Sequence, residues 1–274
     1  MRPILFRIGE FTFPSYTLMI MIGILMATYF AVRICKSRGL PVIYALDMAI
    51  LGILAGFAGA RIGHILVEGG GPSYPHYYSE NWLRIFYVWQ GGFVSWSGYL
   101  AICLSWYFYL RWRKQPIWAY FDAAALVLPI GDFWGRAGCL LTGCCFGKPT
   151  DFFIHLTFSN PASTAYFFYP NTPLHATQIY LMLNGLFIAA VLWIFSKRWW
   201  RFQGQLFAVG WGLYAVMRFL LEFLRGDVDR GVYFNGAISS GQIAMIVYFL
   251  VAAVLYFYLS RLNLAVPEVR TDNR

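Results

Sequence analysis

Four polar residues of one apolar segment have the spacing of a helical face. At intervals of four, four and three positions, they are Tyr214, Arg218, Glu222 and Arg225. On a helix this spacing places them in a single stripe. A guanidinium group keeps its proton and grips a phosphate through two parallel hydrogen bonds. The stripe therefore predicts either a recess for an anionic group, in which Glu222 orients an arginine, or an Arg–Glu ladder that only ties helices together.

A further arginine lies in the stretch Gly135–Gly147, which reads GRAGCLLTGCCFG. Arg136 stands there between Gly135 and Gly138, and glycine lets ligands and main-chain N–H groups come close. Ionisable groups at membrane depth are costly, so they usually face an interior cavity or a partner. Arg136 is therefore a second candidate for binding an anionic phospholipid headgroup.

Three cysteines occupy the same stretch in the pattern CxxxxCC: Cys139, Cys144 and Cys145. Three interpretations stay open, namely small apolar filler, a disulfide between Cys139 and one of the pair, or a nucleophile beside the charge of Arg136. A zinc site normally has four ligands with recognisable spacing, and this pattern without clustered histidines fits one poorly. Neither a metal nor a cofactor is therefore expected.

The composition indicates that these residues belong to a membrane protein. Of the 274 residues, 59% are hydrophobic and 12% are charged, whereas an ordinary soluble domain has about 25% charged residues. The net charge of +9 comes from short basic clusters between apolar segments rather than from one patch. This pattern is typical of membrane topology and headgroup contact, and it excludes a nucleic-acid partner.

Apolar windows of about 20 residues, long enough to cross a bilayer, predict an all-α integral membrane protein with about seven transmembrane helices. They form a single polytopic membrane domain over residues 1–274. The expected spans are Tyr16–Ile34, Ala45–Val67, Gly92–Leu110, Trp118–Trp134, Gln178–Phe195, Leu206–Leu224 and Ser239–Ser260.

Basic clusters alternate with nearly neutral connections along the chain. The clusters follow the first, third and fifth spans, and by the positive-inside rule these connections are cytoplasmic. The N-terminus is then outside and the C-terminus cytoplasmic, with a tail over about 262–274. Two long loop insertions, about 68–91 and 136–177, are expected on the outer face. The charged ends of three spans also meet there: Arg61 with His64, Asp132 with Arg136, and Arg218 with Glu222 and Arg225.

Several motifs together resemble those of bacterial prolipoprotein diacylglyceryl transferases, nearly from end to end. GRAGCLLTGCCFG is similar to the family signature GRxGNFxNxExxG, and YAVMRFLLEFLRGD (Tyr214–Asp227) with GAISSGQ (Gly236–Gln242) to its C-terminal block. Less specific matches are FPSYTLMIMIG (Phe13–Gly23), GARIGHI (Gly59–Ile65), VWQGG (Val88–Gly92) and LHATQIY (Leu174–Tyr180).

The resemblance implies an enzyme of the bacterial cytoplasmic (inner) membrane that needs no metal. It would move the diacylglyceryl group of phosphatidylglycerol, or of another anionic phospholipid, onto the lipobox cysteine thiol of preprolipoprotein signal peptides. A thioether would form and glycerol phosphate would leave. The implied catalytic residues are Arg136, Arg218, Tyr16 and Glu222. The implied substrate-binding residues are Arg61, His64, Gly135, Gly138, Tyr214, Arg225 and Gln178.

The chain departs from the family pattern at several polar positions. The family histidine of the FHGG segment falls on Trp96, which cannot take a proton, and the signature glutamate falls on Cys144. The two signature asparagines fall on Cys139 and Thr142. Two alternatives follow. One is a divergent phospholipid-dependent transferase with another acceptor or a covalent intermediate on Cys144; the other is a non-catalytic lipid-binding relative.

Overall fold

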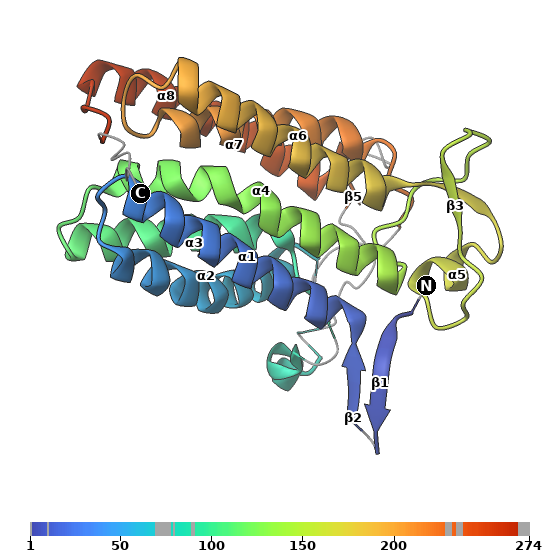
Figure 1. Ribbon diagram of the computed structural model, residues 1–274. Coiled ribbons are helices and arrows are strands. Elements are labelled where there is room, and N and C mark those ends of the chain that lie inside the picture. Colours follow the sequence, from blue (N-terminus) through green and yellow to red (C-terminus); the bar gives the residue numbers. More distant parts are fainter. Residues whose placement is uncertain are drawn as a thin grey trace, which may run out of the picture.

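Seven long helices run back and forth along one axis in the computed structural model (Figure 1). The structure describes residues 2–9, 11–68, 78, 80–88, 91–227, 232–233 and 238–267. Each expected span is confirmed as a helix. The helices are α1 (Ser15–Ser37), α2 (Val42–Gly63), α3 (Ser95–Trp112), α4 (Ile117–Thr142), α6 (Thr177–Arg198), α7 (Gln205–Glu222) and α8 (Ser240–Leu262).

Five helices are long and apolar enough to cross a membrane, namely α1, α2 with its continuation to Leu66, α4, α6 and α8. The other two, α3 and α7, have 18 residues each, or about 27 Å at 1.5 Å per residue. The integral membrane class is thus supported directly by five helices. Membrane crossing by α3 and α7 stays a prediction.

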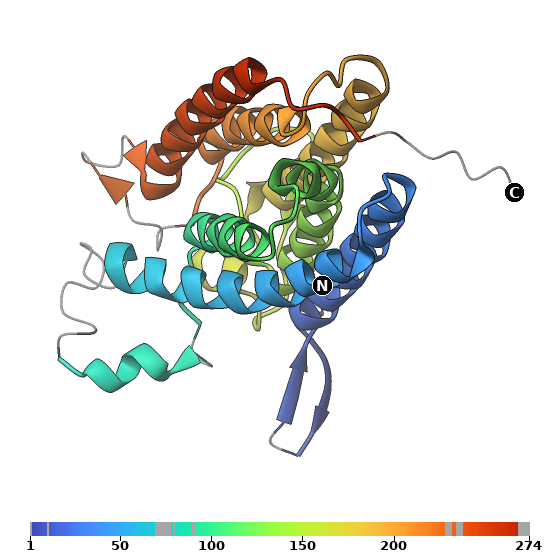
Figure 2. The ribbon, with the colours of Figure 1, turned by 90° about the vertical axis from the view of Figure 1, so that its left-hand side faces the viewer.

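Helix α4 is the centre of the bundle. It lies between a layer of α1, α2 and α3 and a layer of α6, α7 and α8, and Figure 2 shows it (green) surrounded by the others. It contacts α1, α6 and α7 most closely. The run Tyr120–Ala125 is buried on every side, as expected of a helix that is apolar all round.

Short elements gather at the end of the bundle where α1 begins (Figure 1). The second insertion contains β3 (His155–Thr157), α5 (Thr164–Phe168) and β4 (Pro173–His175). A π-helical turn leads into the first insertion, which holds a 3-10 turn, and its residues 69–77, 79 and 89–90 lie outside the described residues. The remaining elements are the hairpin β1 (Ile4–Ile8) and β2 (Phe11–Pro14), η1 (His64–Glu68), η2 (Trp82–Phe86), β5 (Val232–Tyr233) and β6 (Ile238–Ser239).

Helix α4 is longer than the sequence suggested. It continues to Thr142, so Arg136 lies inside the helix and the second insertion begins at Gly143, whose φ is 74°. The glycine at 138 explains this, because a Cβ there would approach Cδ2 of Tyr16 to 2.8 Å. Close packing of α1 on α4 thus keeps a glycine-rich stretch helical, although glycine alone disfavours a helix interior. The C-terminal tail after residue 267 lies outside the described residues.

At the opposite end, Asp122 of α4 caps the start of α7. The carboxylate is fully buried. It accepts hydrogen bonds from the main-chain N–H groups of Gly204 (2.7 Å) and Phe207 (2.9 Å) and from Nε1 of Trp200 (3.0 Å). Acidic groups stabilise helix N-termini by satisfying unpaired N–H groups there. This charge therefore fastens α7 to α4.

Candidate active site

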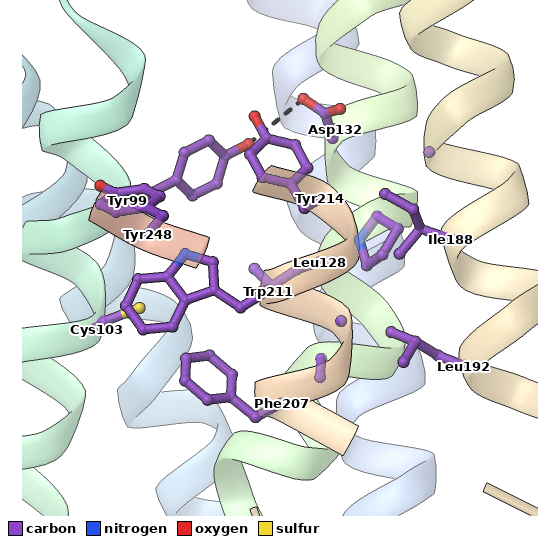
Figure 3. Close-up of a pocket in the computed structure, with 14 residues that line it drawn as sticks. Tyr99, Cys103, Leu128, Asp132, Ile188, Leu192, Phe207, Trp211, Tyr214 and Tyr248 are labelled. Carbon is purple, nitrogen blue, oxygen red and sulfur yellow. Dashed lines mark hydrogen bonds between the residues drawn. The ribbon is translucent and has the colours of Figure 1, made fainter. Parts of the chain in front are cut away.

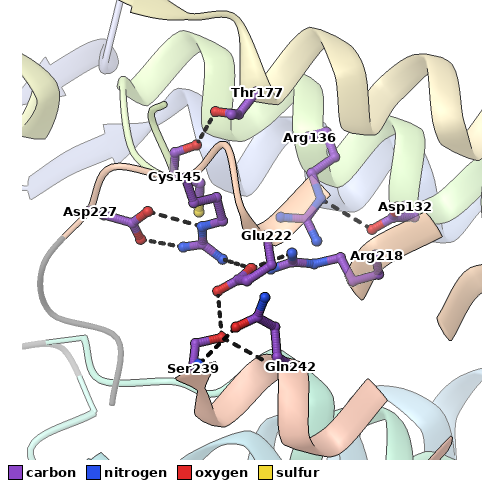
Figure 4. Close-up of polar contacts among 10 residues, drawn as sticks. Asp132, Arg136, Cys145, Thr177, Arg218, Glu222, Asp227, Ser239 and Gln242 are labelled. Carbon is purple, nitrogen blue, oxygen red and sulfur yellow. Dashed lines mark hydrogen bonds and ion pairs between the residues drawn. The ribbon is translucent and has the colours of Figure 1, made fainter. Parts of the chain in front are cut away.

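Glu222, in the last turn of α7, is the centre of a buried ion-pair network (Figure 4). One carboxylate oxygen contacts NH1 of Arg218, four residues earlier, and lies 3.6 Å from NH1 of Arg225. The other accepts a hydrogen bond from Oγ of Ser239 at 3.0 Å. Three of the four residues of the predicted stripe, Arg218, Glu222 and Arg225, therefore meet in one ion-pair network, with Arg225 just beyond the end of α7.

Arg136 of α4 and Arg218 of α7 point toward one another across this network (Figure 4). Both are buried, at 8% and 7% exposure. Nε of Arg136 lies 3.3 Å from Oδ1 of Asp132, close enough for an ion pair but not aligned as a hydrogen bond. The Nε of this guanidinium therefore faces a carboxylate without forming an aligned hydrogen bond to it.

The carboxylate of Asp132, beside Arg136, accepts few hydrogen bonds. Tyr99 donates a hydrogen bond of 3.4 Å to its Oδ1, while Oδ2 is buried without a hydrogen-bond partner among the described residues. Sequence reasoning placed Asp132 at a span end but gave it no role. Its position four residues before Arg136 was the available signal, because residues at that interval meet on a helix.

Arg225 ties the end of α7 to the loop after α4. Its Nε donates to Oδ1 of Asp227 at 2.9 Å, and Gly226 N donates to the carbonyl of Phe146 at 3.0 Å. Burial lowers the pKa of this guanidinium, but the charge of Asp227 outweighs burial and raises the pKa above its usual value. Arg225 is therefore permanently charged and already paired.

The three cysteines of the signature converge. The Sγ atoms of Cys139, Cys144 and Cys145 all lie within 4.8 Å of one another. Two side chains from the start of α6 hold the loop pair: Gln178 Nε2 donates to the Cys144 carbonyl, and Thr177 Oγ1 to the Cys145 carbonyl, each at 2.8 Å. Gln178, predicted to bind substrate, therefore positions the cysteine pair.

The guanidinium of Arg61 donates its hydrogen bonds to main-chain carbonyls. Arg61 is 7% exposed and donates four hydrogen bonds of 2.5–3.1 Å to the segment before α3. His64 begins the π-helical turn beside it, and a Cβ at position 92 would approach its Nε2 to 2.5 Å, which requires the glycine found there. The accepting carbonyls belong to Arg84, Ile85, Gly91 and Gly92.

Two cavities meet at Tyr99 and Asp132. The larger, of about 550 Å³, runs between α1, α2, α3 and α4, with Tyr16 and Asp132 toward the charged end and an apolar lining elsewhere. Its size suits a small-molecule or lipid site. The smaller, of about 80 Å³, lies between α3, α4, α6, α7 and α8 and includes Tyr214 (Figure 3). Gly138 packs on Tyr16, whereas Gly135 has only an ordinary contact.

Trp96, in the first turn of α3, lies against the apolar cluster between α7 and α8 that contains Ala215 and Met245. The hydroxyl of Tyr248 donates a hydrogen bond to its carbonyl. Its indole Nε1 is buried without a hydrogen-bond partner in the described part of the chain. The indole therefore offers a donor where a proton acceptor was expected.

Comparison with known proteins gives one consistent result. The sequence model of a family described as "Prolipoprotein diacylglyceryl transferase" matches residues 3–258. A phosphatidylglycerol–prolipoprotein diacylglyceryl transferase of Clostridium tetani is 30% identical over 230 residues, covering 83% of this chain and 86% of that protein. The protein of the same description from Bordetella parapertussis is 28% identical over 263 residues, covering 94% and 95%. That from Polynucleobacter necessarius is 30% identical over 250 residues, covering 88% of each.

Proposed function

The chain belongs to the prolipoprotein diacylglyceryl transferase family, and on that premise we propose that it transfers the diacylglyceryl group of phosphatidylglycerol to a prolipoprotein. The acceptor is the lipobox cysteine thiol of the signal peptide. A C–S bond forms at the glyceryl carbon, the C–O bond to phosphate breaks, and glycerol phosphate leaves with the electron pair. The observation that carries this proposal is the facing pair of buried arginines, Arg136 and Arg218.

The two arginines act on the donor phosphate. As the C–O bond breaks, negative charge grows on the leaving phosphate, and fixed cations in a water-poor site stabilise that charge strongly. Glu222 fixes Arg218, and Asp132 lies beside Arg136. The Nε edge of Arg136 faces Asp132, and the other N–H groups of the guanidinium would bind a phosphate oxygen.

The acyl chains occupy the cavity of about 550 Å³ between α1 and α4. Its lining is apolar along most of its length, and its charged end meets Asp132 beside Arg136. A phospholipid placed there would have its tails among apolar helices and its phosphate at the arginines. Tyr16 lines the same cavity near that end, where its hydroxyl can position the glyceryl ester groups.

Arg61, His64 and Gln178 act indirectly in this proposal. The four main-chain hydrogen bonds of Arg61 hold the segment that leads into α3, and Gln178 holds the cysteine pair. Arg225 closes the loop of the signature region against α7. These residues shape the site, while Arg136, Arg218, Tyr16 and Tyr214 face the substrate.

A covalent intermediate on Cys144 is disfavoured on chemical grounds. Attack by that thiol would produce a thioether as stable as the product, with no leaving group able to pass the diacylglyceryl unit onward. Useful covalent intermediates divide a difficult step into two easier ones, and this one would not. Direct attack by the acceptor thiol is the mechanism that the site supports.

We propose one polytopic domain in the bacterial cytoplasmic membrane, with the N-terminus outside. The basic clusters after α1, α3 and α6 lie at the same end of the bundle as the described end of α8 (Figure 1). Basic residues favour the cytoplasmic side. The arginine network lies at the opposite end, where a translocated signal peptide would present its cysteine.

The test is a purified assay with phosphatidylglycerol vesicles and a lipobox peptide, read by mass spectrometry of the peptide thioether. Arg136→Ala and Arg218→Ala should abolish product, while Arg111→Ala, an exposed arginine at the other end of the bundle, should not. Near-normal turnover in either buried variant refutes the site. A Cys144→Ala enzyme with full turnover excludes the covalent route, and wild-type protein that neither forms product nor complements a transferase-depleted strain is a non-catalytic relative.

A further inference from the structure

Three thiols form a compact group beside the proposed phosphate site. The Sγ atoms of Cys139, Cys144 and Cys145 lie within 4.8 Å of one another. The other two cysteines, Cys35 and Cys103, are on α1 and α3. Within the described residues no other His, Cys, Asp or Glu set converges so closely.

The chain is folded so that this group is held in place. Helix α4 ends at Gly143, whose N–H donates to the carbonyl of Cys139 at 2.8 Å, and the N–H of Cys144 reaches the same carbonyl at 3.2 Å. The chain therefore turns back over its own last helical turn. Gln178 and Thr177 then fix the next two carbonyls.

Cys145 adopts a left-handed conformation, with φ of 54°. Such a conformation costs a non-glycine residue on the order of 1 kcal/mol and persists where the surroundings impose it. Here Thr177 donates a hydrogen bond to the Cys145 carbonyl. In this conformation the Cys145 thiol lies within 4.8 Å of the other two thiols.

The separations suit a metal ion with sulfur ligands. Zn–S bonds of about 2.3 Å in a tetrahedral arrangement put neighbouring sulfurs about 3.8 Å apart. Sulfurs already within 4.8 Å reach that spacing through small rotations. Thiolates select thiophilic cations over Mg²⁺ or Ca²⁺. Three protein ligands with a fourth position open is the pattern of catalytic rather than structural zinc.

The other interpretations of the cysteines fit less well. Apolar filler gives no reason for three sulfurs to converge or for a strained residue to bring one of them in. A disulfide uses two sulfurs and leaves the third without a role. A divalent ion with three thiolates carries a net charge of −1, and the guanidinium group of Arg136 is on α4 three residues before Cys139.

We propose that Cys139, Cys144 and Cys145 bind one thiophilic divalent cation of the Zn²⁺ class, and that its open fourth position takes the acceptor thiol. The second half rests on the proposed function. Coordination deprotonates a thiol outright, and the proton passes to solvent. The bound thiolate attacks the glyceryl carbon, the C–O bond to phosphate breaks, and the neutral thioether leaves the cation. No change of oxidation state is involved.

This site would supply what Trp96 cannot. A histidine base would remove the thiol proton, but an indole has no basic nitrogen. Coordination achieves the same result because the cation stabilises the thiolate. The thiol cluster is next to Arg136 along α4, so a thiolate held there would lie beside the proposed phosphate site.

The first experiment measures metal stoichiometry in the reduced full chain in detergent micelles. After chelation, Zn²⁺ is added, unbound metal is removed, and the remainder is counted by mass spectrometry. One Zn²⁺ per chain is expected in wild type and in Cys103→Ser, with a loss of tenfold or more in Cys139→Ser, Cys144→Ser and Cys145→Ser. No bound zinc in wild type, or unchanged zinc in the three serine variants, overturns the site. So does a disulfide within the group when thiols are blocked at lysis.

The second experiment tests the fourth position with Co²⁺ as the probe, because sulfur-to-cobalt charge-transfer absorption rises with each thiolate ligand. A lipobox peptide should increase this absorption, and its cysteine-to-serine counterpart should not. Equal spectra with the two peptides overturn the assignment of the fourth ligand. Chelation should slow thioether formation roughly 100-fold, the scale of general-base catalysis, with recovery on adding Zn²⁺.

The two proposals fail in different ways. Zinc binding and the peptide-dependent cobalt band without any thioether product would refute the transferase function and leave the metal site standing. Equal turnover before and after chelation would refute the catalytic role of the cation and leave the transferase function standing. Arg136→Ala, which removes no sulfur ligand, should keep one Zn²⁺ while losing turnover.

Discussion

Helix α4 carries two aspartates ten positions apart, and their hydrogen bonding differs: Asp122 is fully buried, whereas the side chain of Asp132 is 9% exposed. Asp122 accepts three well-formed hydrogen bonds from Trp200, Gly204 and Phe207. Asp132 has one long hydrogen bond from Tyr99, an unaligned ion pair, and an oxygen without a partner in the described structure. A buried carboxylate that has all of its hydrogen bonds, as Asp122 does, stabilises the fold and leaves no hydrogen bond for a ligand to complete.

The same contrast separates the buried arginines. Arg61 donates four hydrogen bonds to main-chain carbonyls, whereas Arg136 keeps a donor without a hydrogen bond. Unsatisfied buried polar groups are expensive and therefore uncommon. Among the described residues, Trp96, Asp132 and Arg136 have such groups toward the end that holds the arginine network, and Arg38 has one toward the other end. The variants below test whether charged side chains that have all their hydrogen bonds stabilise the fold, and whether those that lack hydrogen bonds are needed for turnover.

The largest effect is expected at Arg136 and Arg218, the two arginines that we propose bind the donor phosphate. Arg136→Lys and Arg218→Lys keep the charge but lose the planar fork that matches phosphate. Turnover in the purified assay should fall by roughly 100-fold or more, the effect of losing one charge-stabilising donor. Unfolding temperatures should change little. If lysine sustains turnover within threefold, a point charge suffices and the two-pronged contact is not used.

The next largest effect concerns the stability of the fold and Asp122, at the opposite end of the bundle. Asp122→Ala removes the acceptor of three buried donors, which costs on the order of 3 kcal/mol. Thermal unfolding in detergent should shift down by roughly 5–10 °C, while turnover per folded molecule at lower temperature is retained. An unchanged melting temperature would show that α7 does not depend on this cap.

Asp132→Asn is the matched counterpart on the same helix. The amide keeps the shape and the contact with Tyr99 but removes the charge beside Arg136. Turnover should fall about tenfold, equivalent to about 1.4 kcal/mol, and the melting temperature should stay near that of wild type. Loss of stability comparable to that of Asp122→Ala would erase the distinction between the two aspartates.

The smallest effect is expected at Trp96, whose buried indole N–H has no hydrogen-bond partner among the described residues. Trp96→Phe keeps the apolar packing on α8 and removes only that donor. A rise in KM for phosphatidylglycerol of about threefold is expected, the scale of one modest hydrogen bond. An unchanged KM would assign Trp96 to packing alone.

Much of the fold follows from the sequence because apolar length and charge alternation determine helices directly. The stripe of α7 was also predictable, since intervals of four, four and three fix a helical face whatever the neighbours are. The helical state of Gly135–Thr142 was not, because it depends on Tyr16 packing against Gly138. That contact joins segments more than 100 residues apart and leaves no local signal.

The partner that each charged residue binds was harder to predict than its burial. Arg61 and Arg218 both end apolar segments with glycine or charge nearby, yet one binds main-chain carbonyls and the other a carboxylate. The convergence of the cysteines depends on a turn at Gly143 and on two side chains of α6. The spacing of the three cysteines in the sequence therefore did not predict that their thiols converge. The Ser239 cap of α8, in contrast, follows the S-x-x-Q pattern of a capping box.

The cap at Asp122 has a consequence for synthesis of the chain. Its three partners are translated 78, 82 and 85 residues after it, which at 5–20 residues per second is about 4–17 s later. During that interval none of these three donors can reach the carboxylate of Asp122. The cap can therefore form only after the turn between α6 and α7 has been synthesised.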